Sequence, residues 1–131
     1  MTPTGKVPMV VRIRTIRADR MRYHTPTRME DALGLLATAA PLILAGGTDV
    51  YPACRDRPIL RDTLDITRIA GLRGVARTAD GWRFGATTTW ADVASAGLPP
   101  AFDALRRAAA TVGAVQIQNA GTVAGNLCNA S

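Results

Sequence analysis

Short apolar runs alternate along this chain with stretches of helical periodicity. The run Leu42–Ala45 stops at Gly46-Gly47, the pattern of a buried strand ending in a turn, although periodicity alone leaves a buried helix segment open. The stretch before it carries an apolar stripe at helical spacing, which we expect to pack on a sheet. The stripe comprises Met29, Ala32, Leu33, Leu36 and Ala40.

Both ends of this predicted helix carry sequence signals. Thr27 and Glu30 have the spacing of a capping box, in which two side chains satisfy backbone groups at the first turn. Pro41 ends the helical stretch directly before the apolar run. Nearer the N-terminus, Val10–Ile16 alternates branched apolar residues with arginine and weakly predicts a strand. The predicted unit is therefore strand, helix, strand and glycine turn.

Shorter elements are predicted downstream. Tyr51–Arg61 contains two prolines, which favours a turn or a short irregular helix, and Thr63–Ile66 is expected to be a strand. Val75–Thr78 and Trp82–Ala86 flank Ala79-Asp80-Gly81, which predicts a hairpin. Trp90–Val93 is expected to be a short capped helix with an aspartate in its first turn.

A longer helix is predicted from Pro99-Pro100 until Gly113 ends it. Its apolar face comprises Phe102, Leu105, Ala109 and Val112. The whole pattern predicts an α+β fold in two lobes that meet near residues 65–75. Residues 23–131 are expected to form the domain, preceded by a basic extension, residues 1–22, that we expect to be disordered.

Composition excludes several kinds of site. His24 is the only histidine, and Ser95 and Ser131 are the only serines, which disfavours a Ser-His-Asp triad or a histidine zinc site. Cys54 and Cys128 lie far apart, so we expect reduced, structural thiols. Two cysteines cannot supply the four ligands that an iron–sulfur cluster usually takes.

The net charge of +6 is concentrated near the N-terminus, where residues 1–20 carry five basic side chains and one acidic one. Such an arm attracts nucleic acid or an anionic membrane surface, so nucleic-acid binding through the arm is one alternative. No groove-reading motif or interleaved aromatic set accompanies it, and we expect no nucleic-acid partner. No apolar stretch reaches membrane-spanning length, and no secretory signal is apparent, which predicts a cytoplasmic protein.

Two small-residue segments carry the candidate chemistry. The first is Ala45–Asp49, and the second is Gln118–Asn126, where Gly121 and Gly125 bracket a predicted loop. Glycine lets a backbone approach a ligand closely, and successive N–H groups can cradle an anion. Hydrogen bonds to a charged group contribute about 1.5–3 kcal/mol each, so backbone donors can hold a pyrophosphate without lysine. Plain turns are the alternative for both segments, and neither P-loop nor Rossmann glycine motifs occur.

The two segments together resemble the flavin-binding segments of the molybdenum hydroxylase family, in its medium, FAD-binding subunit (xanthine dehydrogenase and carbon monoxide dehydrogenase type). The resemblance covers about Tyr23 to Ser131, with both segments in the family's order and separation. Tyr23–Thr27, Leu64–Ile66 and Phe84–Thr88 also agree with the family. The resemblance implies a two-lobed FAD-binding fold of the vanillyl-alcohol-oxidase (PCMH) type.

The resemblance also implies which residues contact FAD. The first segment is expected to wrap the pyrophosphate, the second to contact the phosphates and the flavin side, and Val112 to lie near the flavin. The set comprises Leu44, Ala45, Gly46, Gly47, Thr48, Asp49, Val50, Val112, Thr122, Val123, Ala124, Gly125 and Asn126. A branched side chain at Gly46 or Gly125 is then expected to enter the phosphate's space. No residue is expected to be catalytic or to bind a metal.

By the same resemblance, the partners are a large subunit with the molybdenum cofactor and a small subunit with 2Fe-2S clusters. Electrons are expected to pass through FAD to NAD or another acceptor. The family continues past Ser131 with a further domain, so we expect a chain truncated at its C-terminus. The alternative function is a non-catalytic remnant that binds no flavin and acts at most as an interaction module.

Overall fold

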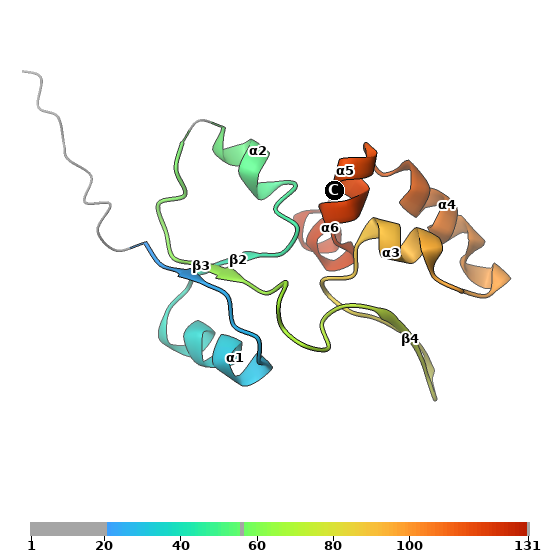
Figure 1. Cartoon of the computed structure of the whole chain (residues 1–131), viewed down its shortest axis with the longest axis horizontal. Helices are drawn as coiled ribbons and strands as arrows, with labels where there is room; N and C mark the ends of the chain where they lie inside the picture. Colours follow the sequence, from blue (N-terminus) through green and yellow to red (C-terminus); the bar gives the residue numbers. More distant parts are fainter. Residues whose placement is uncertain (1–20, 56, 131) are drawn as a thin grey trace, which may run out of the picture.

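A parallel sheet of three strands forms one region of the molecule in the computed structural model, which describes residues 21–55 and 57–130 (Figure 1). The strand order is β1 (Tyr23–His24), β3 (Thr63–Asp65) and β2 (Leu42–Leu44). The register pairs Leu42 with Thr63 and Leu44 with Asp65. The strands expected at Leu42–Ala45 and Thr63–Ile66 are therefore confirmed, whereas the one expected at Val10–Ile16 lies outside the described residues.

Helix α1 (Met29–Thr38) follows β1 and buries a narrower face than its sequence predicts. Ala32 is buried with Leu64 and Ile69, and Leu35 packs partly against them. The expected apolar stripe is therefore confirmed at Ala32 but wrong at Leu33, which remains 56% exposed. The stripe residues left exposed include Met29, Leu33 and Leu36.

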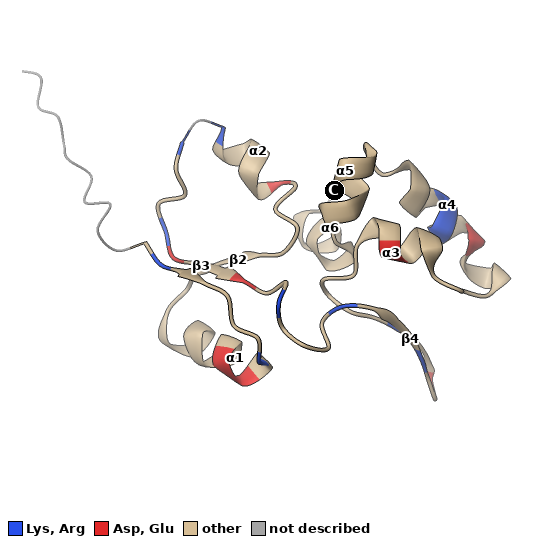
Figure 2. Ribbon diagram, in the orientation of Figure 1, with Lys and Arg blue, Asp and Glu red and all other residues tan. Residues whose placement is uncertain are grey.

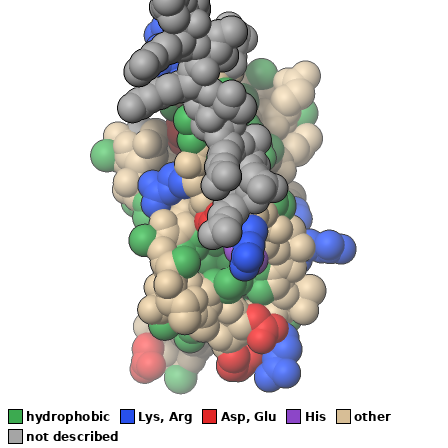
Figure 3. Space-filling model, turned by 90° about the vertical axis from the view of Figure 1, so that its left-hand side faces the viewer, with side chains coloured by type: hydrophobic (Ala, Val, Ile, Leu, Met, Phe, Trp, Pro, Cys, Tyr) green, Lys and Arg blue, Asp and Glu red, His purple; other side chains and the backbone are tan. Residues whose placement is uncertain are grey.

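The start of α1 also differs from the prediction. The N-cap residue is Arg28, and no side chain caps the helix, so the expected Thr27–Glu30 capping box is absent. The Thr27 carbonyl instead accepts a hydrogen bond from the Ala70 backbone N–H at 3.1 Å. Glu30 pairs with Arg28 at 3.3 Å on the surface. On the side of the molecule seen in Figure 3, hydrophobic side chains are scattered among polar and charged ones.

Two elements confirm local predictions. Helix α2 (Val50–Cys54) is the short helix expected within Tyr51–Arg61. Strands β4 (Val75–Thr78) and β5 (Gly81–Phe84) form the expected antiparallel hairpin, with Thr78 opposite Gly81. Gly81 has a φ of +148°, a conformation that side chains rarely adopt, which accounts for glycine directly after the turn.

Short helices make up the remainder of the chain and gather beside the hairpin (Figure 1). They are α3 (Trp90–Ser95), the 3₁₀ turn η1 (Pro100–Phe102), α4 (Asp103–Thr111), α5 (Val115–Ala120) and α6 (Val123–Asn129). Val93, Leu98 and Ala109 are the buried centre of a second hydrophobic cluster. The Phe102 ring meets the edge of the Trp82 ring at a centroid distance of 6.0 Å. None of the helices in the described part of the chain is long and apolar enough to cross a bilayer.

Candidate functional site

The first small-residue segment lies at the carboxyl end of β2, where open parallel sheets usually bind ligands. Gly47 has a φ of +70°, which turns the chain from the strand into α2. The Tyr51 N–H donates to the Gly47 carbonyl at 3.0 Å and closes this turn. Among the described residues, the backbone N–H groups of Gly46, Gly47, Thr48 and Asp49 donate to no acceptor. The segment therefore carries a run of unpaired backbone donors.

The second segment is helical, whereas the sequence predicts a loop. Helix α5 ends at Ala120, Gly121 follows in an extended conformation, and Thr122 is the N-cap of α6. The Thr122 hydroxyl accepts a hydrogen bond from the Gly125 N–H at 3.1 Å, and Thr122 is only 3% exposed. The predicted contacts from Thr122 to Asn126 thus lie on the first turn of a helix rather than on a loop.

The two segments touch each other at their glycines. A Cβ atom on Gly46 would lie 1.8 Å from the Ala120 carbonyl oxygen, which real Cβ atoms never approach. A Cβ atom on Gly121 would lie 3.4 Å from the Thr48 hydroxyl. A side chain at Gly46 would therefore clash with the other segment, and the expectation that it would enter the phosphate's space is wrong. Gly46 is needed for the backbones to meet.

A cavity of about 330 Å³ lies between the two segments. The predicted residues on its wall are Ala45, Gly46, Gly47, Thr48, Asp49, Val50, Thr122, Ala124, Gly125 and Asn126. Sequence reasoning did not include five further lining residues, namely Ile43, Ile66, Ala86, Cys128 and Asn129. Ile43 precedes the predicted Leu44 on β2, and Ile66 directly follows β3, where its N–H donates to the Leu44 carbonyl at 2.9 Å. The register of β2 on β3 is therefore the signal that would have found them.

Three predicted residues lie elsewhere. Leu44 is 2% exposed and its side chain lies on the sheet face opposite to Ile43, as strand alternation requires. Val123 packs against the second hydrophobic cluster. Val112 caps the C-terminus of α4 and is not on the cavity wall.

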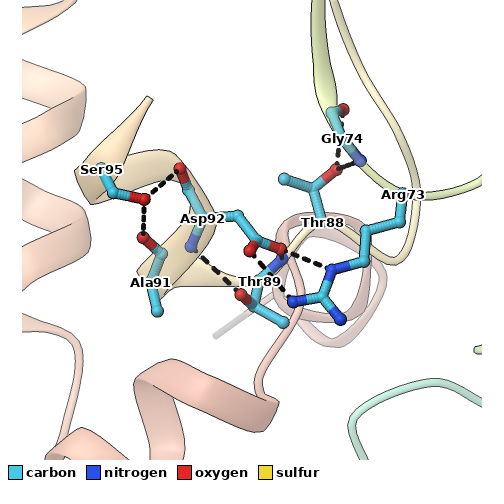
Figure 4. Close-up of polar contacts among 7 residues, drawn as sticks. All are labelled: Arg73, Gly74, Thr88, Thr89, Ala91, Asp92 and Ser95. Atoms are coloured by element: carbon cyan, nitrogen blue, oxygen red, sulfur yellow. Dashed lines mark hydrogen bonds and ion pairs between the residues drawn. The ribbon is translucent and has the colours of Figure 1, made fainter. Parts of the chain in front are cut away.

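A polar network that includes Arg73, Thr88, Thr89 and Asp92 (Figure 4) supports the second segment. Thr89 pairs with Thr122 in an antiparallel bridge, and the Val123 N–H donates to the Thr88 carbonyl at 2.9 Å. Thr89 is also the N-cap of α3 in a complete capping box with Asp92, which confirms the short capped helix with an aspartate in its first turn. Arg73 binds the Asp92 carboxylate with two nitrogens, at 2.9 and 3.0 Å.

The ion pair with Arg73 changes the pKa of Asp92. The hydrogen bond from Arg73 is the largest effect, and with the bonds from Thr89 it lowers the pKa of Asp92 to about 2. Thr88 is completely buried, and its hydroxyl bridges the backbone of Gly74 with two bonds of 3.0 Å. The hairpin, α3 and the start of α6 are thereby joined in one network.

Charge is scarce around the cavity. Asp49 is the only charged residue on its described wall, and the ribbon of α5 and α6 carries no charged residue (Figure 2). Across the described residues, no group of three His, Cys, Asp or Glu side chains is placed to hold a metal ion. An anion in this cavity would therefore be held by backbone donors rather than by lysine or arginine.

A glycine segment at the end of a parallel strand, facing the start of a helix across a small cavity, is an arrangement typical of nucleotide-binding domains that mix helices and strands. Residues 19–131 match the family described as the FAD binding domain in molybdopterin dehydrogenase. The chain belongs to this family, whose cofactor is FAD.

Similar proteins agree with this membership. The chain is 36% identical over 117 residues to the xanthine dehydrogenase FAD-binding subunit of Escherichia coli O157:H7, covering 85% of this chain and 39% of that protein. It is 32% identical over 114 residues to the nicotinate dehydrogenase FAD-subunit of Eubacterium barkeri, covering 83% and 38%. Carbon monoxide dehydrogenase from Hydrogenophaga pseudoflava superposes with a TM-score of 0.71 at 30% identity, covering 82% and 39%.

These matches confirm the predicted family and the mixed helix and strand fold. The chain spans about two fifths of the length of the relatives that it matches.

Proposed function

We propose that this chain binds FAD between its two small-residue segments and serves as part of the flavin subunit of a molybdenum hydroxylase. The observation that carries the proposal is the run of unpaired N–H groups from Gly46 to Asp49 on the cavity wall. Four such donors, each contributing about 1.5–3 kcal/mol toward a charged group, suit a pyrophosphate. The residues that hold FAD in this cavity are then the predicted ones on its wall, which are Ala45 to Val50, Thr122 and Ala124 to Asn126. Contacts of FAD with Leu44, Val112 and Val123 stay predictions from the resemblance.

The fit to FAD is best for its central part. The cavity volume of about 330 Å³ is at the lower end of small-molecule sites, which suits one half of a dinucleotide. The small side chains of Ala45, Ala86 and Ala124 leave the wall open to a ring or a phosphate. FAD supplies the redox chemistry when bound, and this chain's residues bind and orient it.

The proposal extends to the partners of the chain. A large subunit with the molybdenum cofactor and a small 2Fe-2S subunit would deliver electrons, and NAD or another acceptor would remove them. The names of the relatives support this assignment, since they describe FAD subunits of xanthine and nicotinate dehydrogenases. A cytoplasmic location stays a prediction.

The alternative function is a remnant that binds no flavin and acts at most as an interaction module. A single experiment separates the two functions. The purified chain is titrated with FAD and with ADP, while flavin absorbance and thermal unfolding are recorded.

Stoichiometric FAD, displaced by ADP but not by adenosine, is expected if backbone donors hold the pyrophosphate. Asn126→Asp places a negative charge on the cavity wall and should weaken FAD binding at least fivefold by repulsion. The same change leaves α6 at least as stable, because acidic residues suit the first turns of a helix. Gln116→Glu, an exposed position of α5 outside this cavity and a neighbouring one, is the matched control. Equal FAD affinity in both variants contradicts the site, and no binding by the parent chain favours the remnant.

A further inference from the structure

Helix α1 carries a second apolar face beside the one that packs on the sheet. Met29, Leu33 and Leu36 follow one another at spacings of four and three residues, so their side chains form one stripe along the helix. They are 39%, 56% and 39% exposed, whereas Ala32 on the packed face is 3% exposed. Single exposed apolar residues are common on protein surfaces, but a continuous stripe on one helix is typical of a surface that contacts another polypeptide.

Small side chains extend this stripe toward the end of the helix. Ala37 lies one turn after Leu33, and Ala40 lies one turn after Leu36. Both alanines are exposed, and side chains of this size let a second helix approach closely. No residue of α1 lines the cavity between the two small-residue segments, so a partner on this face leaves that cavity open.

The two ends of α1 carry opposite charge. Glu30 and Asp31 lie in its first turn, where Figure 2 shows the acidic residues of this helix. Its last turn has no basic residue, but the Arg61 guanidinium donates a hydrogen bond of 2.7 Å to the Ala40 carbonyl just beyond the helix. Arg61 is exposed and forms no ion pair with a described residue. Glu30 pairs with Arg28 on the surface, and exposed pairs of this kind contribute little.

This distribution of charge is complementary to itself when the helix is turned end for end. In an antiparallel pair of α1 helices around a twofold axis, the acidic start of each helix faces the basic end of the other. The apolar stripes then meet at Leu33, near the middle of the helix. A parallel pair would instead bring the two Glu30 carboxylates together, which is unfavourable. The charges therefore favour a second copy of this chain in antiparallel orientation.

We propose that the stripe of Met29, Leu33 and Leu36 is a self-association surface, on which a second copy of this chain docks through its own α1. The contact does not depend on FAD, because α1 lies outside the cavity. A helix of ten residues is about 15 Å long, so the interface is smaller than those of stable complexes. The dimer is therefore weak and forms in proportion to the concentration of the chain.

The first test compares Leu33→Glu with Leu127→Glu in the full chain. Sedimentation equilibrium is recorded up to about 1 mM protein, because small interfaces bind weakly. Leu33→Glu should raise the dissociation constant of the dimer at least tenfold, since the substitution acts twice in a twofold interface. Leu127 is 77% exposed on α6, and Leu127→Glu should leave the constant unchanged. Both variants should keep the parent's circular dichroism, because glutamate is a good helix former.

The second test reverses the charges at the two ends of α1. Glu30→Arg and Arg61→Glu should each raise the dissociation constant about fivefold, because each places like charges across the interface. The double variant again has opposite charges at the facing ends, so it should recover most of the parent's affinity. Residues that act only within one chain would show no such recovery.

Several outcomes overturn the inference. One is a parent chain that stays monomeric at every concentration. Another is a dimer that Leu33→Glu leaves unchanged or that Leu127→Glu weakens equally. Dimerisation that appears only after deletion of residues 1–20 would assign the stripe to that segment of the parent chain instead. FAD affinity should be the same in Leu33→Glu and the parent, so the proposed function and this inference can fail separately.

Discussion

The two small-residue segments have similar sequences but different backbones. Ala45–Asp49 leaves β2 as a turn, and the N–H groups from Gly46 to Asp49 have no acceptor in the described part of the chain. Thr122 instead opens α6, and its hydroxyl pairs with the Gly125 N–H. The first segment therefore has backbone N–H groups available to a ligand, whereas the Gly125 N–H of the second segment is bonded to the N-cap threonine of its own helix. Glycine and threonine at similar spacing do not distinguish these two roles.

The largest expected effect concerns the point where the segments meet. Gly46→Ala places a Cβ atom against the Ala120 carbonyl, and this oxygen belongs to the last residue of α5, so it has little freedom to move. We expect a loss of about 3 kcal/mol in the free energy of unfolding, measured by urea denaturation. Any loss of FAD binding in this variant then reports on the fold rather than on the phosphate.

Gly34→Ala is the control for this substitution. Gly34 lies within α1, and a Cβ atom there would meet nothing within 4 Å. Alanine should stabilise the helix by about 0.5–1 kcal/mol, because glycine loses more backbone entropy on folding. A Gly46→Ala chain as stable as its parent would show that the segments do not touch as described.

A smaller effect is expected from the two threonines. Thr122→Ala removes the N-cap of α6 and should lower the free energy of unfolding by about 1 kcal/mol, while Thr122→Ser keeps the hydroxyl and most of the stability. Thr48→Ala should change it by less than about 0.5 kcal/mol, because the Thr48 hydroxyl caps nothing. Equal losses at both positions would contradict the difference between the segments.

Local signals in the sequence were sufficient for several elements. The hairpin followed from Ala79-Asp80-Gly81, and the capped start of α3 from Thr89 and Asp92, because each depends on neighbouring residues only. The stretch from Val115 to Ala120 was missed as a helix because its glycine-flanked, uncharged residues give no amphipathic pattern.

The buried face of α1 and the role of Gly46 depend on tertiary packing, so the sequence did not predict them fully. The apolar stripe of α1 was only partly right, because Ala32 is buried against Leu64 whereas Met29, Leu33 and Leu36 stay exposed. The role of Gly46 depends on Ala120, which lies far away in the sequence, so only the folded backbone shows it. The family resemblance nevertheless predicted most of the residues on the cavity wall, because it assigned both segments to one ligand.

The smallest expected effect concerns the support of the second segment. The pKa of Asp92 is lowered from its ordinary value of 3.8 to about 2, chiefly by the hydrogen bond from Arg73. The ionised carboxylate is favoured in the folded state, so this stability is present above pH 4 and is lost as the pH falls through about 2. The Arg73 side chain is 61% exposed, which limits the contribution to roughly 0.5 kcal/mol.

Asp92→Asn tests this support, because the asparagine oxygen can still accept from the Thr89 N–H while the ion pair is lost. The parent should be more stable than the variant at pH 6, and the two free energies of unfolding should converge only when the pH is well below 2. Asp103→Asn, which removes an ion pair with Arg106 inside α4, is the control that leaves Thr89 and Thr122 untouched. A difference between parent and Asp92→Asn that persists well below pH 2 would show that the asparagine disturbs the cap itself. Convergence would show that the effect comes from the charge of Asp92. This charge holds α3 in place and, through Thr89, also the start of α6.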